Sequence, residues 1–369
     1  MNIEIPRSEL LPALAVVSGV VERRQTLPIL GNLLVSASDG ELRIRATDLE
    51  LEISTRVGAD VEEGGEVTVP ARKFVDICRA LPEGARVKLR TEGERAILAS
   101  GRSRFTLSTL PGANFPSLEL GEAGLLLDLP AVVLKRLLEK TAFAMAQQDV
   151  RYYLNGVMLE FGSGPMIAVA TDGHRLAKLT ATVRNGGEGM EEPRQIILPA
   201  KSVLELKRLL PADDDAIRME VSERTLRVSF GDTVVVSKLV DGRYPDYERV
   251  IPKELPRKAT VDREALRAAL QRAAILSNEK YKGVRVTFAP GTLGLQAHNP
   301  EKEQAEDEIE MDYQGDTVVI GFNVAYIVDV LQALDRDQVD VQFRDADSSA
   351  IWSGTDTDDE TFVIMPMRL

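Results

Sequence analysis

Hydrophobic and polar positions alternate most clearly between Arg151 and Leu179, a stretch that reads RYYLNGVMLEFGSGPMIAVATDGHRLAKL. Over Gly156–Phe161 the pattern comes close to a period of two, which is typical of a β-strand. A Gly-Ser-Gly-Pro turn follows, and then a second apolar run, Met166–Ala170, which ends at Thr-Asp-Gly. Two apolar runs joined by a short glycine-containing connection predict a β-hairpin.

Related stretches stand on either side of this one. Upstream, Ile29–Glu52 (ILGNLLVSASDGELRIRATDLELE) again shows an apolar run, an Asp-Gly turn and a run that closes on Ala-Thr-Asp. Downstream, Lys282–Pro300 (KGVRVTFAPGTLGLQAHNP) has a Pro-Gly turn and closes on Ala-His-Asn. Thr171 lies 124 residues after Thr47, and His298 lies 127 residues after Thr171. This spacing predicts one unit written three times, each long enough to be a domain rather than a solenoid repeat.

Each third contains further elements in the same order. An amphipathic helix is predicted before the hairpin, at Arg7–Ser18, Pro130–Ala146 and Asp262–Leu276. After the hairpin, a strand that runs into a second helix is predicted at Val67–Pro82, Ile196–Pro211 and Val318–Leu334. A strand pair is predicted to close each third, at Arg86–Leu110, Ala216–Leu239 and Val339–Met367. Such a unit is an α+β domain, whose two helices must cover one face of an antiparallel sheet to bury their apolar stripes.

Length and composition agree with this organisation. A chain of 369 residues holds roughly two or three domains of ~100–200 residues. Turn-rich segments at Gly121–Gly124 and Pro252–Pro256 predict the domains 1–122, 123–254 and 255–369. No apolar run approaches the ~20 residues of a membrane helix, and no signal peptide is visible. The single cysteine, Cys78, excludes an internal disulfide, so we expect a cytoplasmic protein with no membrane partner.

Charge is unevenly distributed along the chain. The net charge of −13 by itself disfavours a nucleic-acid partner. The six predicted helical windows nevertheless hold thirteen basic and seven acidic residues, so they carry +6 and the rest of the chain carries −19. If all six helices lie on one side, that side attracts a polyanion while the remainder repels it. Solvated helix faces are the alternative that the charges alone leave open.

A set of longer motifs identifies a family. In chain order these are TLPILGNLL, ATDLELE, VPARKFVDICRALP, GRSRFTLSTLP, QDVRYYLNG, ATDGHRLA, SKLVDGRYPDY, RAAILSNEKYKGVR, GFNVAYIVDVL and the terminal VIMPMRL. Together they resemble the beta subunits of bacterial DNA polymerase III, the sliding clamps, over essentially the whole chain. The resemblance implies three repeated clamp domains, each with two helices packed on antiparallel sheets, in a head-to-tail homodimeric ring of six similar domains.

The resemblance also implies how such a ring works. The helices line a hole that encircles double-stranded DNA, and phosphate contacts without sequence readout suffice because the DNA is held by topology. Tethering a polymerase to the ring raises its effective concentration at the primer end, which gives processivity. The implied partners are a second copy of the chain, the DNA polymerase III alpha subunit, the clamp loader delta subunit, other DNA polymerases, mismatch-repair proteins and ligase. No cofactor and no metal are implied.

In the family, partner peptides insert into a hydrophobic cleft. Carried over by motif, the cleft comprises Leu154, Thr171, Gly173, His174, Arg175, Leu176, Pro245, Arg249, Val250, Asn323, Tyr326, Val363, Met365, Pro366, Met367 and Arg368. A final core strand is the alternative interpretation of this apolar C-terminus, although two methionines around a proline suit an adaptable binding surface. Glu248 stands where the family often has a basic residue, and we expect it to weaken attraction for acidic flanks of partner peptides.

Candidates for DNA contact combine basic, amide and aromatic side chains. They are Arg24, Arg72, Lys73, Gln148, Arg151, Tyr152, Tyr153 and Lys201. The two adjacent tyrosines offer planar surfaces to sugars or exposed bases. Ordinary surface charge is the alternative for the basic members.

The ring joint requires two different, complementary surfaces. In the first third, the candidates are basic and apolar: Arg95, Arg102, Arg104, Phe105 and Leu107. In the last third, they are acidic and apolar: Ile275, Leu276, Glu301, Glu303 and Asp307.

Two other classes of function remain as alternatives. Asp172, His174 and Arg175 could form a general acid–base set, but the equivalent segments of the other thirds keep no histidine at that position. Two histidines in the whole chain offer little for a metal site, and the sequence shows no phosphate-cradling loop or nucleophile elbow. We therefore expect no catalytic residues. A repeat scaffold that binds peptides without encircling DNA is the second alternative.

Overall fold

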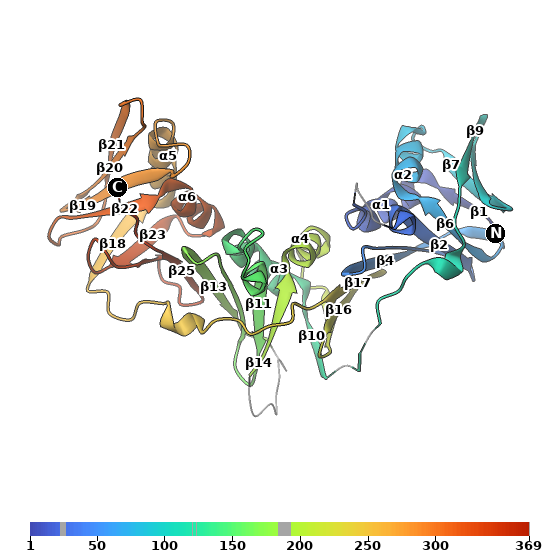
Figure 1. Ribbon diagram of the computed structural model, residues 1–369, viewed down its shortest axis with the longest axis horizontal. Helices are drawn as coiled ribbons and strands as arrows, with labels where there is room; N and C mark the ends of the chain where they lie inside the picture. The colour runs from blue at the N-terminus through green and yellow to red at the C-terminus, as the bar shows by residue number, and fades with distance from the viewer. Residues whose placement is uncertain (23–26, 120, 123, 184–192, 369) are drawn as a thin grey trace. The chain divides into compact units, whose positions relative to one another are not determined.

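The computed structural model describes residues 1–22, 27–119, 121–122, 124–183 and 193–368, with six α-helices and twenty-five β-strands among them (Figure 1). These residues form two compact units. The first unit comprises Met1–Lys135 and Lys201–Leu239, and the second comprises Arg136–Ala200 and Val240–Leu369.

The first unit contains a five-stranded and an eight-stranded antiparallel sheet. The smaller sheet has the order β5 (Asp60–Glu63), β1 (Asn2–Pro6), β7 (Arg86–Glu92), β8 (Arg95–Ser100), β9 (Ser103–Ser108). The larger has the order β10 (Leu125–Pro130), β15 (Ala216–Val221), β16 (Thr225–Phe230), β17 (Thr233–Lys238), β4 (Leu51–Gly58), β3 (Glu41–Thr47), β2 (Asn32–Ser38), β6 (Gly65–Pro70). Helices α1 (Arg7–Ser18) and α2 (Ala71–Ala80) pack side by side on the larger sheet (Figure 1). The short helices are η1 (Pro28–Gly31) and η2 (Gly112–Asn114).

The second unit repeats this plan with an eight-stranded and a four-stranded sheet. The larger sheet has the order β14 (Arg194–Pro199), β11 (Gly156–Phe161), β12 (Met166–Thr171), β13 (Arg175–Ala181), β25 (Glu360–Ile364), β24 (Ala350–Gly354), β23 (Gln338–Phe343), β18 (Arg257–Asp262). The smaller has the order β21 (Gln304–Glu310), β20 (Thr292–His298), β19 (Gly283–Ala289), β22 (Val318–Asn323). Helices α5 (Arg263–Ala274) and α6 (Val324–Ala333) pack against each other. The remaining helices of the chain are α3 (Ala131–Thr141), α4 (Ala200–Leu209), η3 (Ala142–Ala144), η4 (Tyr152–Leu154) and η5 (Tyr247–Arg249).

Helix boundaries follow from ordinary capping and amphipathic patterning. The side chain of Asp262 accepts a hydrogen bond from the amide of Ala265 at 2.8 Å, which satisfies one free N–H at the start of α5. The apolar residues that recur at helical spacing along α5 are all buried, namely Leu266, Ala269, Leu270 and Ala273. In α2, by contrast, Arg72 and Lys73 are exposed.

The three thirds share the same hydrogen bonds between their helices and loops. The first residue of the first helix donates its amide N–H to the loop after the second helix, at 2.8 Å in each case: Arg7 to Ala85, Ala131 to Asp215 and Arg263 to Asp337. A cation of the first helix also reaches the C-terminal end of the second: Arg7 donates to Cys78, Lys135 to Leu210 and Arg263 to Leu334. Basic side chains stabilise a helix C-terminus because its carbonyls lack partners. The predicted repeat is therefore confirmed.

The structure corrects four details of the sequence prediction. The final part of each third is three strands rather than a pair, and a further strand (β1, β10 or β18) precedes each first helix. Each hairpin also continues into a third strand (β4, β13 or β21). The helix expected to reach Ala146 ends at Thr141, whose hydroxyl donates to the carbonyl of Leu137 at 2.7 Å and is followed by the turn η3.

The same strand pairing joins successive thirds twice. In the first unit, β17 pairs with β4 in antiparallel register, with Val235 opposite Ile53. In the second unit, β25 pairs with β13, with Phe362 opposite Ala177. In each case the last strand of one repeat pairs with the strand that follows the hairpin in the preceding repeat. The strands in the corresponding positions at the two ends, β9 and β21, are sheet edges.

Candidate functional site

An apolar cluster in the second unit gathers the buried members of the predicted cleft. Leu154 in η4, Leu176 in β13 and Val363 in β25 are all buried and belong to one cluster with Tyr244 and Tyr247. Leu176 and Val363 stand opposite each other in the strand pairing. The other members are Ala146, Met158, Val169 and Ile197.

The C-terminal residues 365–368, here called the tail, are fixed by two backbone hydrogen bonds. The amide of Met365 donates to the carbonyl of His174 at 3.0 Å, and the amide of Met367 donates to the carbonyl of Gly321 at 2.8 Å. The tail begins after β25 ends at Ile364, and Met365 is 44% exposed. The core-strand interpretation therefore holds for Val363 and Ile364 in β25, whereas Met365, Pro366 and Met367 stay at least partly exposed.

Further cleft candidates surround the cluster. Val250, just after η5, is 46% exposed, and Pro245 and Pro366 are at least partly exposed. Asn323 is used structurally, since its side chain accepts the amide of Ala325 at 2.9 Å and caps α6. A hollow of about 360 Å³ adjoins the end of the tail, lined by Asn278, Tyr281, Gly283, His298, Asn299, Pro300, Met367 and Arg368.

Asp172 organises the turn between β12 and β13. One of its carboxylate oxygens accepts the amides of His174 (2.9 Å) and Arg175 (3.1 Å), and the other accepts Nε of Arg175 (3.1 Å). The hydroxyl of Thr171 accepts the amide of Gly173 at 3.1 Å. Gly173 has φ of +90°, a conformation that side chains disfavour. Both carboxylate oxygens of Asp172 thus accept hydrogen bonds within the turn. This is the role of a turn residue rather than of a general base.

The guanidinium of Arg175 has hydrogen-bond partners in three segments and stacks on an aromatic ring. Besides Asp172, its guanidinium donates to Asp329 of α6 (2.5 Å) and to the carbonyl of Phe143 (2.6 Å). It also stacks over Tyr326 of α6, with 4.3 Å from Cζ to the ring centroid. Burial raises the pKa of the Tyr326 phenol, and Asp172 adds to the effect. Arg175 therefore fixes Tyr326 beside the turn instead of presenting a free cation.

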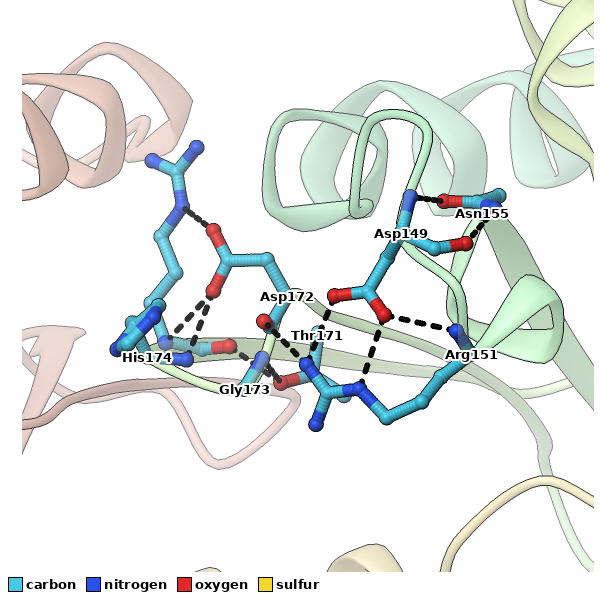
Figure 2. A network of polar contacts seen from close by, with 8 residues as sticks. Asp149, Arg151, Asn155, Thr171, Asp172, Gly173 and His174 are labelled. Atoms are coloured by element: carbon cyan, nitrogen blue, oxygen red, sulfur yellow. Dashed lines mark hydrogen bonds and ion pairs between the residues drawn. The ribbon is translucent and has the colours of Figure 1, made fainter.

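A second polar network connects the loop before η4 to this turn (Figure 2). The carboxylate of Asp149 accepts Nε and Nη2 of Arg151 at 3.0 and 2.8 Å, and Asn155 bonds the backbone of Asp149 in both directions at 2.9 Å. The Arg151 hydrogen bonds lower the pKa of Asp149 to about 2. Nη2 of Arg151 also lies 3.4 Å from the carbonyl oxygen of Asp172. A Cβ on Gly173 would come within 3.1 Å of Nη2 of Arg151, so a side chain at this position would make the guanidinium shift by a few tenths of an ångström.

The candidates for DNA contact fall into two groups. Arg72 and Lys73 are exposed on α2, Tyr152 is 57% exposed, and Gln148 has φ of +55° in the loop before η4. Tyr153 packs against the apolar cluster and edge-on against Tyr152.

The second group is engaged within the chain. Lys201 donates to the carbonyl of Val20 at 3.1 Å and forms ion pairs with Glu22, at 2.8 Å, and with Asp48. Arg151 is paired with Asp149 as described above. Arg24 lies outside the described residues.

The ring-joint candidates lie on or beside the two sheet edges. Arg104, Phe105 and Leu107 are in the edge strand β9, with Arg95 in the adjacent β8 and Arg102 in the turn between them. Asp307 is in the edge strand β21, where Arg272 donates to it at 2.7 Å, and Glu301 and Glu303 are exposed just before it. Ile275, directly after α5, is 78% exposed, and Leu276 is partly exposed.

Sequence reasoning missed several residues that build this site. Phe143, Asp149 and Asp329 contact predicted site residues without having been predicted themselves, and Lys178 lies over the ring of Tyr247 in the apolar cluster, which was not predicted either. Only Asp149 carried a local signal, since it stands two residues before Arg151 in a turn. Phe143 and Asp329 reach Arg175 from segments 32 and 154 residues away, which no local pattern connects.

Two features are absent from the described residues. No group of three or more His, Cys, Asp and Glu side chains there is placed to hold a metal ion. Likewise, no helix in the described part of the chain has the length and apolar character needed to cross a membrane.

The fold and the site define an α+β protein of three repeated domains. Residues 1–119, 128–246 and 248–368 match the N-terminal, central and C-terminal domains of the DNA polymerase III beta subunit family. The beta sliding clamps of Pseudomonas putida and Escherichia coli K12 are 47% and 45% identical to the chain, and each comparison covers 100% of the chain and 100% of the relative. The crystal structure of a sliding clamp from Pseudomonas aeruginosa bound to griselimycin is 46% identical, with a TM-score of 0.96 and full coverage of both chains.

The chain therefore belongs to the DNA polymerase III beta subunit family, the bacterial DNA sliding clamps, whose members are non-catalytic subunits of the replication machinery.

Proposed function

We propose that two copies of this chain close head to tail into a ring around duplex DNA and tether polymerases to it. The ring would contain six domains, with boundaries in each copy at 1–122, 123–254 and 255–369. The chain would act in the cytoplasm as a processivity factor, without a cofactor.

The main support for the proposed ring is that two strands, β9 and β21, lie at sheet edges. Successive thirds are joined by pairing the last strand of one with the third hairpin strand of the one before it. The two strands that lack this partner are β9 at the start of the series and β21 at its end. Edge strands offer unpaired N–H and C=O groups for pairing with another chain. A contact between β9 of one copy and β21 of the next would continue the series and is heterologous, as a head-to-tail ring requires.

Charge supports the same contact. The described residues of β21 include four carboxylates, at Glu306, Asp307, Glu308 and Glu310. The β9 side carries Arg95, Arg102 and Arg104. The exposed Ile275 supplies an apolar contact beside the acidic edge. Opposite charges fix register and partner choice, while apolar burial supplies affinity.

For DNA, we propose contacts from Arg72, Lys73, Gln148, Tyr152 and Tyr153, with Arg24 retained from the sequence prediction. We leave out Lys201 and Arg151, because their cations already have carboxylate partners. Contacts of this kind bind phosphates without reading sequence.

For partners, we propose that the apolar cluster and the tail form the peptide cleft. Its support is the fixed tail backbone, which presents Met365 and Met367 without a large ordering cost on binding. The proposed occupants are the clamp-binding peptides of the polymerase III alpha subunit, the clamp loader delta subunit, other DNA polymerases, mismatch-repair proteins and ligase. The Pseudomonas aeruginosa relative was solved with griselimycin bound.

Retention on DNA of different topology tests the ring. The chain is loaded with a clamp loader onto nicked circular DNA, and half of the sample is then linearised with a restriction enzyme. We expect retention on the circles and loss from the open ends, because a ring slides off. Equal retention on both forms would instead favour a scaffold that binds DNA from the side, and no retention on either would contradict DNA encirclement.

A further inference from the structure

The surface around Tyr247 at the edge of the apolar cluster is negatively charged. Tyr247 is buried in the cluster, and burial, followed by the nearby carboxylates of Glu160, Glu248 and Asp246, raises the pKa of its phenol to about 12. Three carboxylates therefore act on one ring of the proposed cleft wall. Like charges around a site disfavour a further negative charge there.

The positive charges nearby are already paired. Lys178 lies two residues after Leu176 in β13, so the two side chains share a face of the strand. Its Nζ lies 2.8 Å from Oε1 of Glu248 and 5.4 Å from the centroid of the Tyr247 ring. The side chain of Lys178 is largely buried, and its ammonium group interacts with Glu248 and with the Tyr247 ring.

The second cation is Arg249, which is 86% exposed and lies 2.9 Å from a carboxylate oxygen of Asp246. The edge, defined here as Glu160, Lys178, Asp246, Glu248 and Arg249, thus holds three carboxylates against two cations. Glu248 and Asp246 are exposed, so their charges face whatever approaches the cluster from this side.

We propose that this edge selects partner peptides that carry a basic residue beside their apolar anchor, and disfavours those with an acidic residue there. The inference rests on the proposed function of the cluster and tail as a peptide cleft. A peptide lysine or arginine would share the carboxylate of Glu248 with Lys178, whereas a peptide carboxylate would meet Glu248 beside cations that already pair with carboxylates. A single exposed charge changes such an affinity by about two- to five-fold at low salt.

Two peptides test the proposal. Both carry the clamp-binding segment of the polymerase III alpha subunit from the same cell, and they differ only in two lysines or two glutamates next to the apolar anchor. With the full-length dimer, we expect the lysine peptide to bind about five-fold more tightly in 50 mM salt, and the difference to shrink in 500 mM salt because exposed charges are screened. The Glu248→Lys variant should reverse the preference, and Glu248→Gln should reduce it.

Glu83→Lys is the matched control, since Glu83 is exposed in the first unit and the substitution changes the net charge equally. This control should keep the wild-type preference. If the wild-type protein and Glu248→Lys bind both peptides equally, charge selection by this edge is wrong while the cleft stands. If neither peptide binds the wild-type protein at any salt concentration, the proposed cleft itself is wrong, and this proposal with it.

Discussion

Nη1 of Arg175 lies 2.5 Å from Oδ2 of Asp329, which stands 154 residues further along the chain. This contact joins the turn after β12, in the second repeat, to helix α6, in the third repeat. Arg175 also stacks on Tyr326, one helical turn before Asp329. The ion pair therefore fixes two of the predicted cleft residues relative to each other.

Removing the carboxylate of Asp329 should loosen this arrangement. We expect Asp329→Asn to lower the free energy of unfolding by about 1 kcal/mol, because the pair is hydrogen-bonded but Asp329 is partly exposed. Peptide affinity should fall by less than about ten-fold, since 1.4 kcal/mol corresponds to a factor of ten. Denaturant unfolding and calorimetry measure the two effects. The equivalent substitution on α2, Asp76→Asn, affects an exposed pair at 3.9 Å and should change neither.

The tail should be needed for partner binding but not for folding. Met367→Ala, or deletion of residues 365–369, should leave a stable dimer that no longer binds the polymerase alpha peptide, because the tail presents its apolar side chains outside the β25 core. Calorimetry with the peptide measures this loss. Truncation of another exposed apolar residue, Leu126→Ala in β10, serves as the control. Unchanged peptide affinity in the deletion variant would remove the tail from the proposed cleft.

Much of the fold could be predicted because local patterns specify it. The hydrophobic pattern predicts the first helix at Arg7–Ser18, which are its bounds in the structure, and Asp262 caps α5 as its position before an apolar run suggests. Short strands such as β1 and β10 were missed, since five or six residues beside a helix give too little periodicity to stand out.

Contacts between distant segments were the part that sequence could not supply. The charge count along the predicted helices treats all thirteen basic residues alike, yet Lys135 and Arg263 donate to the carbonyls at the C-terminal ends of neighbouring helices. Lys140 is buried beside Glu360, 220 residues away. Such pairings depend on which segments the fold brings together, and a charge count along the chain does not contain that information.

The dimer should depend on the apolar residues after α5. We expect Ile275→Ala combined with Leu276→Ala to give monomers at micromolar concentration, because losing two large apolar side chains costs the interface roughly 3 kcal/mol, or more than a hundred-fold in the dissociation constant. Sedimentation velocity measures the change. Val319→Ala removes a side chain that is 41% exposed in β22 and should leave the dimer intact. A dimeric double variant would reject the proposed joint.

Asp149 should titrate far below its ordinary range. Its pKa in the folded chain is about 2, because Arg151 hydrogen-bonds the ionised form, whereas an unfolded aspartate titrates near ~3.9. The contribution of this pair is therefore fully present above about pH 4 and is lost as the pH falls toward 2. Carboxyl-detected NMR should give the low midpoint in the wild-type protein and an ordinary one in Arg151→Gln. Identical midpoints in both would mean that the Asp149–Arg151 pair does not form in solution.

Substitutions at two basic sites should affect different properties, DNA binding at one site and stability at the other. Arg72 and Lys73 are exposed on α2, so Arg72→Ala with Lys73→Ala should weaken binding to duplex DNA equally for all sequences and reduce the salt slope by about 2, since each phosphate contact contributes about 0.9. Lys201 instead holds Asp48, Glu22 and the carbonyl of Val20. Lys201→Ala should therefore lower the unfolding temperature, because it leaves the largely buried Asp48 carboxylate without its cation, and should leave the salt slope unchanged. Fluorescence anisotropy across a salt series, paired with thermal unfolding of both variants, separates the two. A reduced salt slope in Lys201→Ala would return this lysine to the DNA-contacting set, and an unchanged slope in the double variant would remove α2 from it.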